Sequence, residues 1–251
     1  MQEGDVFKTK SYGDLIVTKY VNSKAVCVKF VVTGYETTTQ AISIRRGSVK
    51  DRLLPTVYGI GITGDIQVNV NGQYLKEYKI WKRVLCRCYS VGYQKVQPTY
   101  IDCSVSENFR YLEYFKEWCN SQIGFNSVDE KGKPFALDKD ILFKGNKIYS
   151  EEACAFVPQE INGLFIKRDK LRGDYPIGVS FRKDGGMFRA TLNNKHLGRF
   201  NTAEQAFQVY KTAKEAYIKE VANKWKDQID PRVYDAMVNF EFKWEDKETK
   251  V

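Results

Sequence analysis

The chain has 251 residues, a formal net charge of +9 at pH 7, 43% hydrophobic residues and 14% aromatic residues. This length and apolar content predict a folded protein with room for two or three small domains, and they exclude a disordered chain. No apolar run approaches the ~20 residues that a membrane span needs, and the N-terminus lacks a signal-peptide core, so we expect a cytoplasmic protein without membrane contact.

Residues 1–72 are rich in β-branched and aromatic residues, which favour strands. The runs 14–21 and 25–32 flank a turn at Asn22–Lys24. We expect a small β-barrel or curled sheet of the SH3 kind. Such modules bind peptides, nucleic acids or nothing, so a protein-interaction role for this module stays open.

A glycine-rich motif follows, in which Gly59, Gly61 and Gly64 match the G-x-G-x-x-G spacing of dinucleotide-binding loops. That motif needs a preceding strand and a helix that begins within it. Here the strand-like run 65–70 follows and ends in Asn71–Gly72. We therefore expect these glycines to serve turns and do not expect nucleotide binding.

Two amphipathic helices are predicted next, at about 75–92 and 106–121. The simplest interpretation of these two helices is structural: an apolar stripe faces the core and the opposite face is solvated. In the first helix, basic residues interleave with the apolar stripe of Tyr78, Trp81, Leu85 and Cys88; they are Lys76, Lys79, Lys82, Arg83 and Arg87. The six cysteines form no C-x-x-C pair and the chain has one histidine, so we expect reduced thiols and no zinc site.

Residues 73–165 hold an ordered series of short motifs. The series includes Tyr78-x-x-Trp81, Leu85-Cys86-Arg87-Cys88-Tyr89, Leu137-Asp138-Lys139-Asp140-Ile141, Gly145-Asn146, Glu152-Ala153-Cys154 and Gln159-Glu160-Ile161-Asn162. In this order the motifs resemble phage and mobile-element HNH endonucleases. The resemblance implies a two-stranded hairpin and a helix that grip one divalent metal, which activates water against a phosphodiester.

Carried over by position, the resemblance implies catalytic residues Asp138, Lys139, Asp140 and Asn162. It implies a metal ligand at Asp138, and we predict that Asp140 and Asn146 complete a rebuilt Mg²⁺ site, with Glu152 as a further candidate ligand. Two positions depart from the family. Lys139 stands where the catalytic His belongs, and a lysine is a poor base near neutral pH. Ala153 stands where a ligand Asn usually lies, so active and inactive versions of the site both stay open.

A basic segment at 167–173 is expected to be a linker, either simply solvated or in contact with backbone phosphate. The following residues, 175–222, predict three short strands and one helix, with turns at 183–186 and Asn193–Asn194. Alternation places Val179, Phe181, Phe188, Ala190, Leu192 and Leu197 on one face of the sheet and Ser180, Arg182, Arg189, Thr191, Asn193 and His196 on the other.

The helix begins with a capping box, Thr202 and Gln205. Its apolar stripe is predicted to cover the apolar face of the sheet and consists of Ala203, Phe207, Tyr210, Ala213, Tyr217, Val221 and Trp225. Positive charge concentrates here, because residues 166–226 carry 14 Lys+Arg and 6 Asp+Glu, a net charge of +8. Such a concentration favours nucleic acid as the partner.

This segment resembles the APETALA/ethylene-response-factor DNA-binding domain. The matching residues are Gly178–Val179, 188–192, 197–200 with Thr202, and Ala206 with Tyr210. The resemblance implies a sheet that enters the DNA major groove. It implies contacts from Ser180, Arg182, Thr191, Asn193, Asn194 and His196, with Arg189 and Lys195 on phosphates. Plant domains carry arginines and tryptophans at several of these positions, so no recognised base sequence is implied.

We therefore expect a modular α+β protein. The expected parts are a β-rich module at 1–72, a degenerate HNH-like domain at 73–165, an APETALA-like domain at 166–229, and a short helix with an acidic tail at 230–251. The resemblances imply a phage-type protein that binds double-stranded DNA and is either a metal-dependent endonuclease or nickase, or a catalytically inactive DNA-binding regulator.

Overall fold

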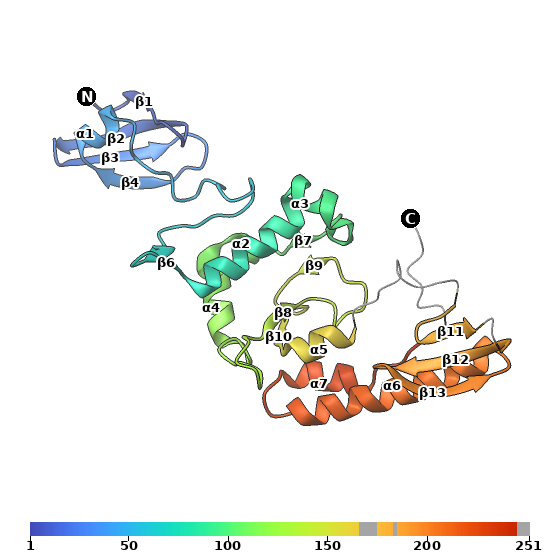
Figure 1. The fold of residues 1–251 in the computed structure, drawn as a ribbon. Helices are drawn as coiled ribbons and strands as arrows, with labels where there is room; N and C mark the ends of the chain where they lie inside the picture. The colour runs from blue at the N-terminus through green and yellow to red at the C-terminus, as the bar shows by residue number, and fades with distance from the viewer. Residues whose placement is uncertain (166–174, 183–184, 245–251) are drawn as a thin grey trace. The chain divides into compact units, whose positions relative to one another are not determined.

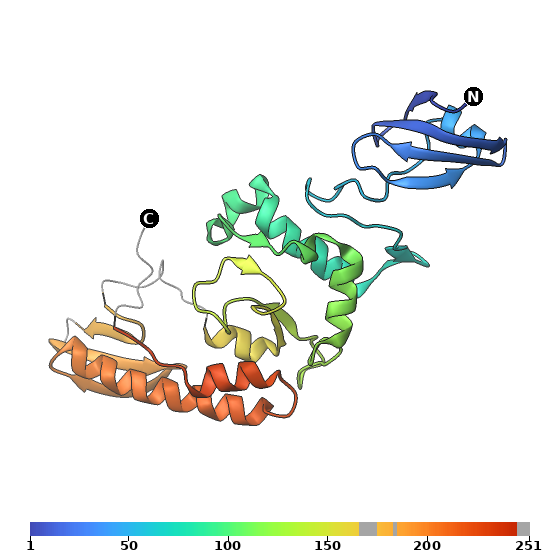
Figure 2. The same ribbon diagram turned by 180° about the vertical axis from the view of Figure 1, so that it is seen from behind.

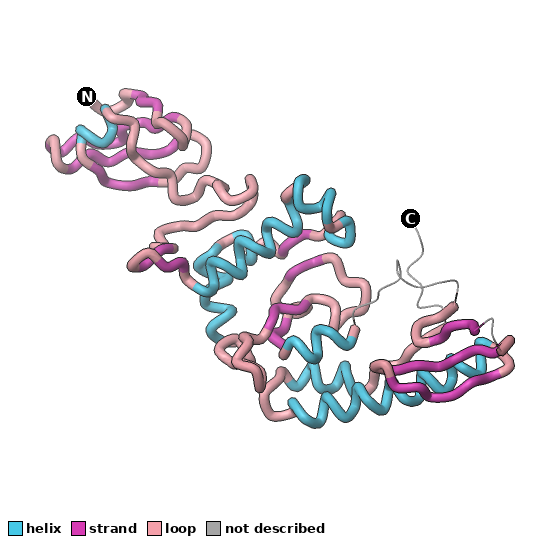
Figure 3. Tube along the Cα trace, viewed as in Figure 1, coloured by secondary structure: helices cyan, strands magenta, loops and turns pink. Residues whose placement is uncertain are grey.

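The computed structural model describes residues 1–165, 175–182 and 185–244, and the predicted linker at 167–173 lies outside them. The protein mixes helices with several small sheets (Figures 1 and 3). The chain forms two compact units, Met1–Cys119 with Lys147–Ser150, and Asn120–Asn146 with Glu151–Val251. The expected middle domain, 73–165, therefore contributes to both units.

The first unit begins with an antiparallel sheet in the order β1-β2-β3-β4. Leu15, Val26 and Phe30 are buried in its core. None of the described sheets closes into a barrel, so the barrel interpretation is wrong for this module. Instead of further strands, the short helix α1 contributes Ala41 and Ile44 to the core. The elements are β1 (Val6–Lys8), β2 (Asp14–Asn22), β3 (Ala25–Phe30), β4 (Glu36–Thr39) and α1 (Ala41–Arg45).

The rest of the first unit is mainly helical. The expected strand at 65–70 shortens to a two-residue strand, and the second expected helix begins at Leu112. The indole of Trp81 donates to the Phe109 carbonyl oxygen at 2.7 Å, and the rings of Phe109 and Trp118 lie 4.8 Å apart. The elements are β5 (Asn69–Val70), β6 (Gln73–Tyr74), α2 (Lys76–Tyr89), α3 (Val91–Val96), η1 (Pro98–Tyr100), β7 (Ser104–Val105), η2 (Asn108–Arg110), α4 (Leu112–Ser121) and β9 (Ile148–Tyr149).

The second unit contains a small hairpin with a helix and a larger sheet with a long helix. β8 (Ala136–Asp138) pairs antiparallel with β10 (Ala155–Val157), and α5 (Gln159–Leu164) follows. The larger sheet has the order β11-β12-β13. Its elements are β11 (Val179–Arg182), β12 (Met187–Leu192) and β13 (Lys195–Phe200), with α6 (Ala203–Trp225) and α7 (Pro231–Val238) after them.

Helix α6 lies along one face of the β11-β12-β13 sheet in both views (Figures 1 and 2). It begins where the capping pattern predicted, because the Thr202 hydroxyl accepts from the Gln205 backbone N–H at 3.2 Å. Ala190 is fully buried at the centre of the sheet. The buried face of α6 differs slightly from the predicted stripe: Ala213 and Tyr217 are half-buried, and Lys214 and Ile218 are buried instead.

The close packing of sheet and helix depends on Gly178, which precedes β11. Its φ of +79° favours glycine, and a Cβ placed there would lie 2.0 Å from the Tyr210 ring. Glycine therefore lets α6 approach the first strand. No helix within the described part of the chain is long and apolar enough to cross a membrane.

Candidate nucleic-acid interface

The face of the β11-β12-β13 sheet that points away from α6 carries a row of three polar residues. The strand registers place Arg189 directly between Ser180 and Arg199. Arg199 is exposed and Arg189 is half-buried. Like charges opposite each other on neighbouring strands destabilise a sheet unless an anion lies between them. This row is therefore suited to hold an anion.

No acidic side chain neutralises this face within the described residues. The strands β11, β12 and β13 contain no Asp or Glu. Between described residues, no ion pair forms with Arg182, Arg189, Lys195 or Arg199, whereas other lysines and arginines of the same unit do pair with carboxylates. Among the described residues, no carboxylate therefore offsets the positive charge of the sheet.

A bulge in the sheet sets the position of His196. The register shifts after Ala190, so that Thr191 pairs with His196 and Leu197 is the extra residue. The Nε of Arg189 donates to His196 Nδ1 at 3.2 Å. Because Arg only donates, His196 accepts at Nδ1 and carries its proton on Nε2. This contact holds the two side chains together on the polar face.

The eight sequence-predicted DNA-binding residues lie on this face or at its end. Ser180, Arg182, Arg189, Thr191 and His196 share the face away from α6 by strand register. Asn193 and Asn194 form the two-residue turn between β12 and β13, with φ of 48° and 63°, and both are exposed. Lys195 follows the turn and is exposed. The structure thus gathers the predicted contacts on one sheet.

Arg199 is the residue that the sequence interpretation omitted. The sequence pattern includes Arg199 in the 197–200 match but does not predict it as a contact. Strict alternation from Leu197 places Arg199 on the apolar face, but the bulge at Leu197 shifts the phase of the strand. The pairing of Arg199 with Arg189 then places it in the polar row.

Of the four residues predicted at the HNH-like site, three are consecutive at the end of β8 and the fourth, Asn162, belongs to α5. Asp138 ends β8, and its Oδ1 accepts from the backbone N–H groups of Asp140 and Ile141, both at 2.8 Å. Burial raises the pKa of Asp138 above its usual range. The Lys139 side chain is buried, and its ammonium donates to Asp140 Oδ1 and to the Asn146 carbonyl oxygen, both at 2.6 Å.

This arrangement does not fit a divalent metal. A cation bound to the Asp140 carboxylate would be repelled by the Lys139 ammonium 2.6 Å away. The Asn146 side-chain amide donates to the Lys139 carbonyl oxygen at 2.8 Å, which closes the loop from the other side. Within the described residues, no group of three or more His, Cys, Asp and Glu side chains could hold a metal. The metal site stays a prediction without geometric support.

Among the described residues, the side chains of Asn162 and Glu152 take no part in the hydrogen bonds of this loop. Asn162 is in α5, and no hydrogen bond joins its side chain to Asp138 or Asp140 among the described residues. Glu152 lies beside Arg232, whose guanidinium donates to the Glu152 carbonyl oxygen at 3.1 Å. Strands β8 and β10 and helix α5 thus form two antiparallel strands followed by a helix, and among the described residues no hydrogen bond links Asn162 to the other three predicted catalytic residues.

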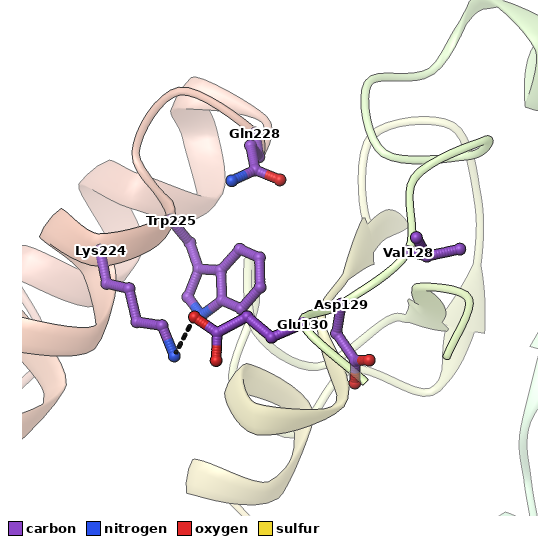
Figure 4. A pocket seen from close by; sticks show the side chains of 6 residues that line it. All are labelled: Val128, Asp129, Glu130, Lys224, Trp225 and Gln228. Atoms are coloured by element: carbon purple, nitrogen blue, oxygen red, sulfur yellow. Dashed lines mark ion pairs between the residues drawn. The ribbon is translucent and has the colours of Figure 1, made fainter. Parts of the chain in front are cut away.

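A shallow hollow of about 200 Å³ lies beside the C-terminal end of α6 (Figure 4). Lys224 points into it and pairs with Glu130 at 3.2 Å and with Glu160 at 2.8 Å. Burial acts to raise the pKa of Glu160, but the hydrogen bonds from Lys224 and Trp225 outweigh it and lower that pKa. The Lys224 ammonium and the two glutamate carboxylates satisfy one another, so we assign no ligand here. Comparisons of the chain with protein families, with curated proteins and with solved structures found no match.

Proposed function

We propose that the protein binds double-stranded DNA through the face of the β11-β12-β13 sheet that points away from α6. The observation that carries the proposal is the cross-strand pair of Arg189 and Arg199 on a sheet whose described strands contain no Asp or Glu. Repulsion between the two guanidinium groups lowers the stability of the free protein. A phosphate bound between them relieves this repulsion.

The arrangement also suits the shape of the duplex. A narrow β-ribbon fits the major groove, which is about 12 Å wide. The basic row would contact phosphates, while Thr191, His196 and the Asn193–Asn194 turn offer hydrogen-bonding groups to base edges. His196 presents a donor at Nε2 because Arg189 occupies Nδ1. Phosphate contacts would give affinity, and the turn with its flanking residues would give any base preference.

Phosphodiester cleavage is not part of this proposal. The Lys139 ammonium engages the Asp140 carboxylate, and Asn162 takes no part in that contact. Of the two versions that the sequence left open, the DNA-binding protein without a metal site is therefore the better supported by the arrangement of side chains.

The proposal is tested with the Arg189→Ala/Arg199→Ala variant. Fluorescence anisotropy measures its affinity for duplex DNA over a range of salt concentrations. Loss of two charge-assisted contacts should weaken binding roughly tenfold or more. The slope of log K against log salt should become shallower by about 2, because each phosphate contact contributes about 0.9.

The matched control is Lys8→Ala/Lys19→Ala. It removes the same number of charges from exposed strand positions of another sheet. We expect duplex affinity close to that of the wild type for this control. Equal loss in both variants would indicate nonspecific attraction to net charge, and no loss in the arginine variant would refute the sheet as the binding face.

A further inference from the structure

A tight turn in the first unit holds Tyr58 in an unfavourable backbone conformation. Tyr58 has φ of 53° and the following Gly59 has φ of 72°. The turn is closed by the Gly61 N–H, which donates to the Val57 carbonyl oxygen at 2.8 Å. A bulky residue in the left-handed region costs about 1–2 kcal/mol, and such strain concentrates at functional sites. Glycine or asparagine would fit this position better, so the tyrosine side chain itself needs an explanation.

The glycine motif explains how this turn reaches helix α2. A Cβ on Gly61 would lie 2.4 Å from Leu85 Cδ1 and 2.6 Å from the Trp81 ring, so only glycine allows the turn to pack on the helix. The glycines that mimic a dinucleotide-binding motif therefore place Tyr58 against α2. The Tyr58 hydroxyl is hydrogen-bonded to Cys86 of that helix, which raises the pKa of Tyr58.

Two further tyrosines lie at the N-terminal end of α2, and one of them, Tyr78, interacts electrostatically with the Tyr58 hydroxyl. The rings of Tyr74 and Tyr78 lie 5.4 Å apart with an interplanar angle of 30°, and Tyr78 continues to Trp81 at 6.1 Å. Tyr74 is 51% exposed and Tyr58 is 39% exposed, although both are large aromatic residues. The protein thus presents aromatic rings to solvent around one flank of the helix.

The solvent face of α2 next to these rings is basic. Lys79, Lys82 and Arg83 are exposed, and Lys82 Nζ lies 6.0 Å from the centre of the Tyr78 ring. Among the described residues, none of these three cations forms an ion pair, and α2 contains a single acidic residue, Glu77. Exposed aromatic rings beside free positive charges are the combination with which proteins hold single-stranded nucleic acids.

We propose that Tyr58, Tyr74 and Tyr78, with Lys79, Lys82 and Arg83, form a second nucleic-acid surface that binds a single strand of DNA by stacking on unpaired bases. The lysines and the arginine contact the backbone, and the tyrosine rings stack on bases without sequence preference. This surface lies in the first unit and does not depend on the duplex-binding sheet, so its failure would leave the proposed function intact.

The test measures binding of the full chain to a fluorescent oligothymidine strand, an abasic strand of the same length and a duplex. The variants are Tyr58→Gly and Tyr74→Ala. Each should weaken binding of the oligothymidine strand about five- to a hundredfold, the range of a single base stack. The abasic strand should bind the wild type more weakly by a similar factor. Duplex binding should stay unchanged.

Tyr58→Gly separates binding from folding. Glycine accepts the φ of 53° without strain, and this relief offsets the lost Cys86 contact, so the melting temperature should change little while single-strand binding falls. Tyr20→Ala is the matched control, since Tyr20 is 40% exposed in β2 and lies outside this surface. It should bind all three ligands like the wild type.

Four outcomes would overturn the proposal. The first is that both tyrosine variants bind oligothymidine as tightly as the wild type does, and the second is that the wild type binds the abasic strand as tightly as oligothymidine. The third is that the variants lose duplex affinity as much as oligothymidine affinity. The fourth is that the wild type binds an RNA strand of the corresponding sequence more tightly than the DNA strand. The arginine variant of the sheet should lose duplex binding without losing oligothymidine binding, which keeps this test separate from that of the proposed function.

Discussion

Lys139 occupies the position at which the HNH resemblance places a general base, and its buried ammonium has a different use. It donates to Asp140 Oδ1 and to the Asn146 carbonyl oxygen and so ties the loop that follows β8 back on itself. A buried cation without partners would be costly, and these two bonds compensate for the loss of water. The Lys139 ammonium thus binds Asp140 Oδ1 and the Asn146 carbonyl oxygen, which are the kind of oxygen atoms that a metal ion would bind.

The Lys139→Met variant should unfold more easily. It keeps most of the apolar volume but loses both charge-assisted hydrogen bonds, which predicts a loss of about 2 kcal/mol in the free energy of unfolding. Urea denaturation followed by tryptophan fluorescence measures this loss. Lys133→Met is the control, because Lys133 is exposed and should change stability little. A stability equal to that of the wild type would show that the ammonium contributes nothing to the loop.

At the scale of elements, the sheet and α6 form one small packing unit. Ala190 at the centre of the sheet and Phe207 and Tyr210 on the helix are buried. The opposite face of the sheet can therefore remain polar without loss of core. The rigid helix behind the strands keeps the row of Ser180, Arg189 and Arg199 in register, as a binding surface requires.

The Gly178→Ala substitution should disrupt this packing. The new methyl group would meet the Tyr210 ring and would also strain the backbone at φ of +79°, so we expect a loss of about 2–5 kcal/mol and weaker duplex binding. Gly186→Ala is the control for backbone strain alone, since its φ is +61° and nothing lies within 4 Å of a Cβ there. It should lose about 1–2 kcal/mol. Equal losses would show that contact with Tyr210 is unimportant.

At the scale of the whole molecule, the two units carry two different surfaces. The second unit presents a basic sheet, which we propose binds duplex DNA, and the first unit presents the tyrosines and cations of α2. Neither surface includes the Asp138–Asn146 loop. DNA binding by the full chain should therefore require no metal ion.

Removal of divalent metal tests this expectation. Duplex affinity should be the same in EDTA as in Mg²⁺ at equal ionic strength, and supercoiled plasmid should stay intact with Mg²⁺ or Mn²⁺. Nicking of the plasmid that disappears in Asp138→Ala would contradict this expectation and would support the endonuclease version. Gel electrophoresis of the plasmid, with wild type and variant at equal concentration, gives the answer.

The sequence by itself determined the local features whose signals lie within a few residues. The alternation in 179–200, the Asn193–Asn194 turn and the Thr202 cap all predicted elements that the structure contains, because strand faces and helix caps are set by near neighbours. The same periodicity predicted most of the buried face of α6. It missed Lys214, because a charged residue is not expected in a core.

Only the tertiary structure decided what depends on residues far apart in the chain. Strand register placed Arg199 opposite Arg189, and packing on Trp81 and Leu85 gave Gly61 its role. The hydrogen bonding of Lys139 also depends on the tertiary structure. Its partner Asn146 lies seven residues away, across a loop whose path no local sequence pattern determines. Motif spacing says which side chains occur together in the chain, whereas distances of a few Å between them, which determine charge pairing and metal binding, arise only when the chain folds.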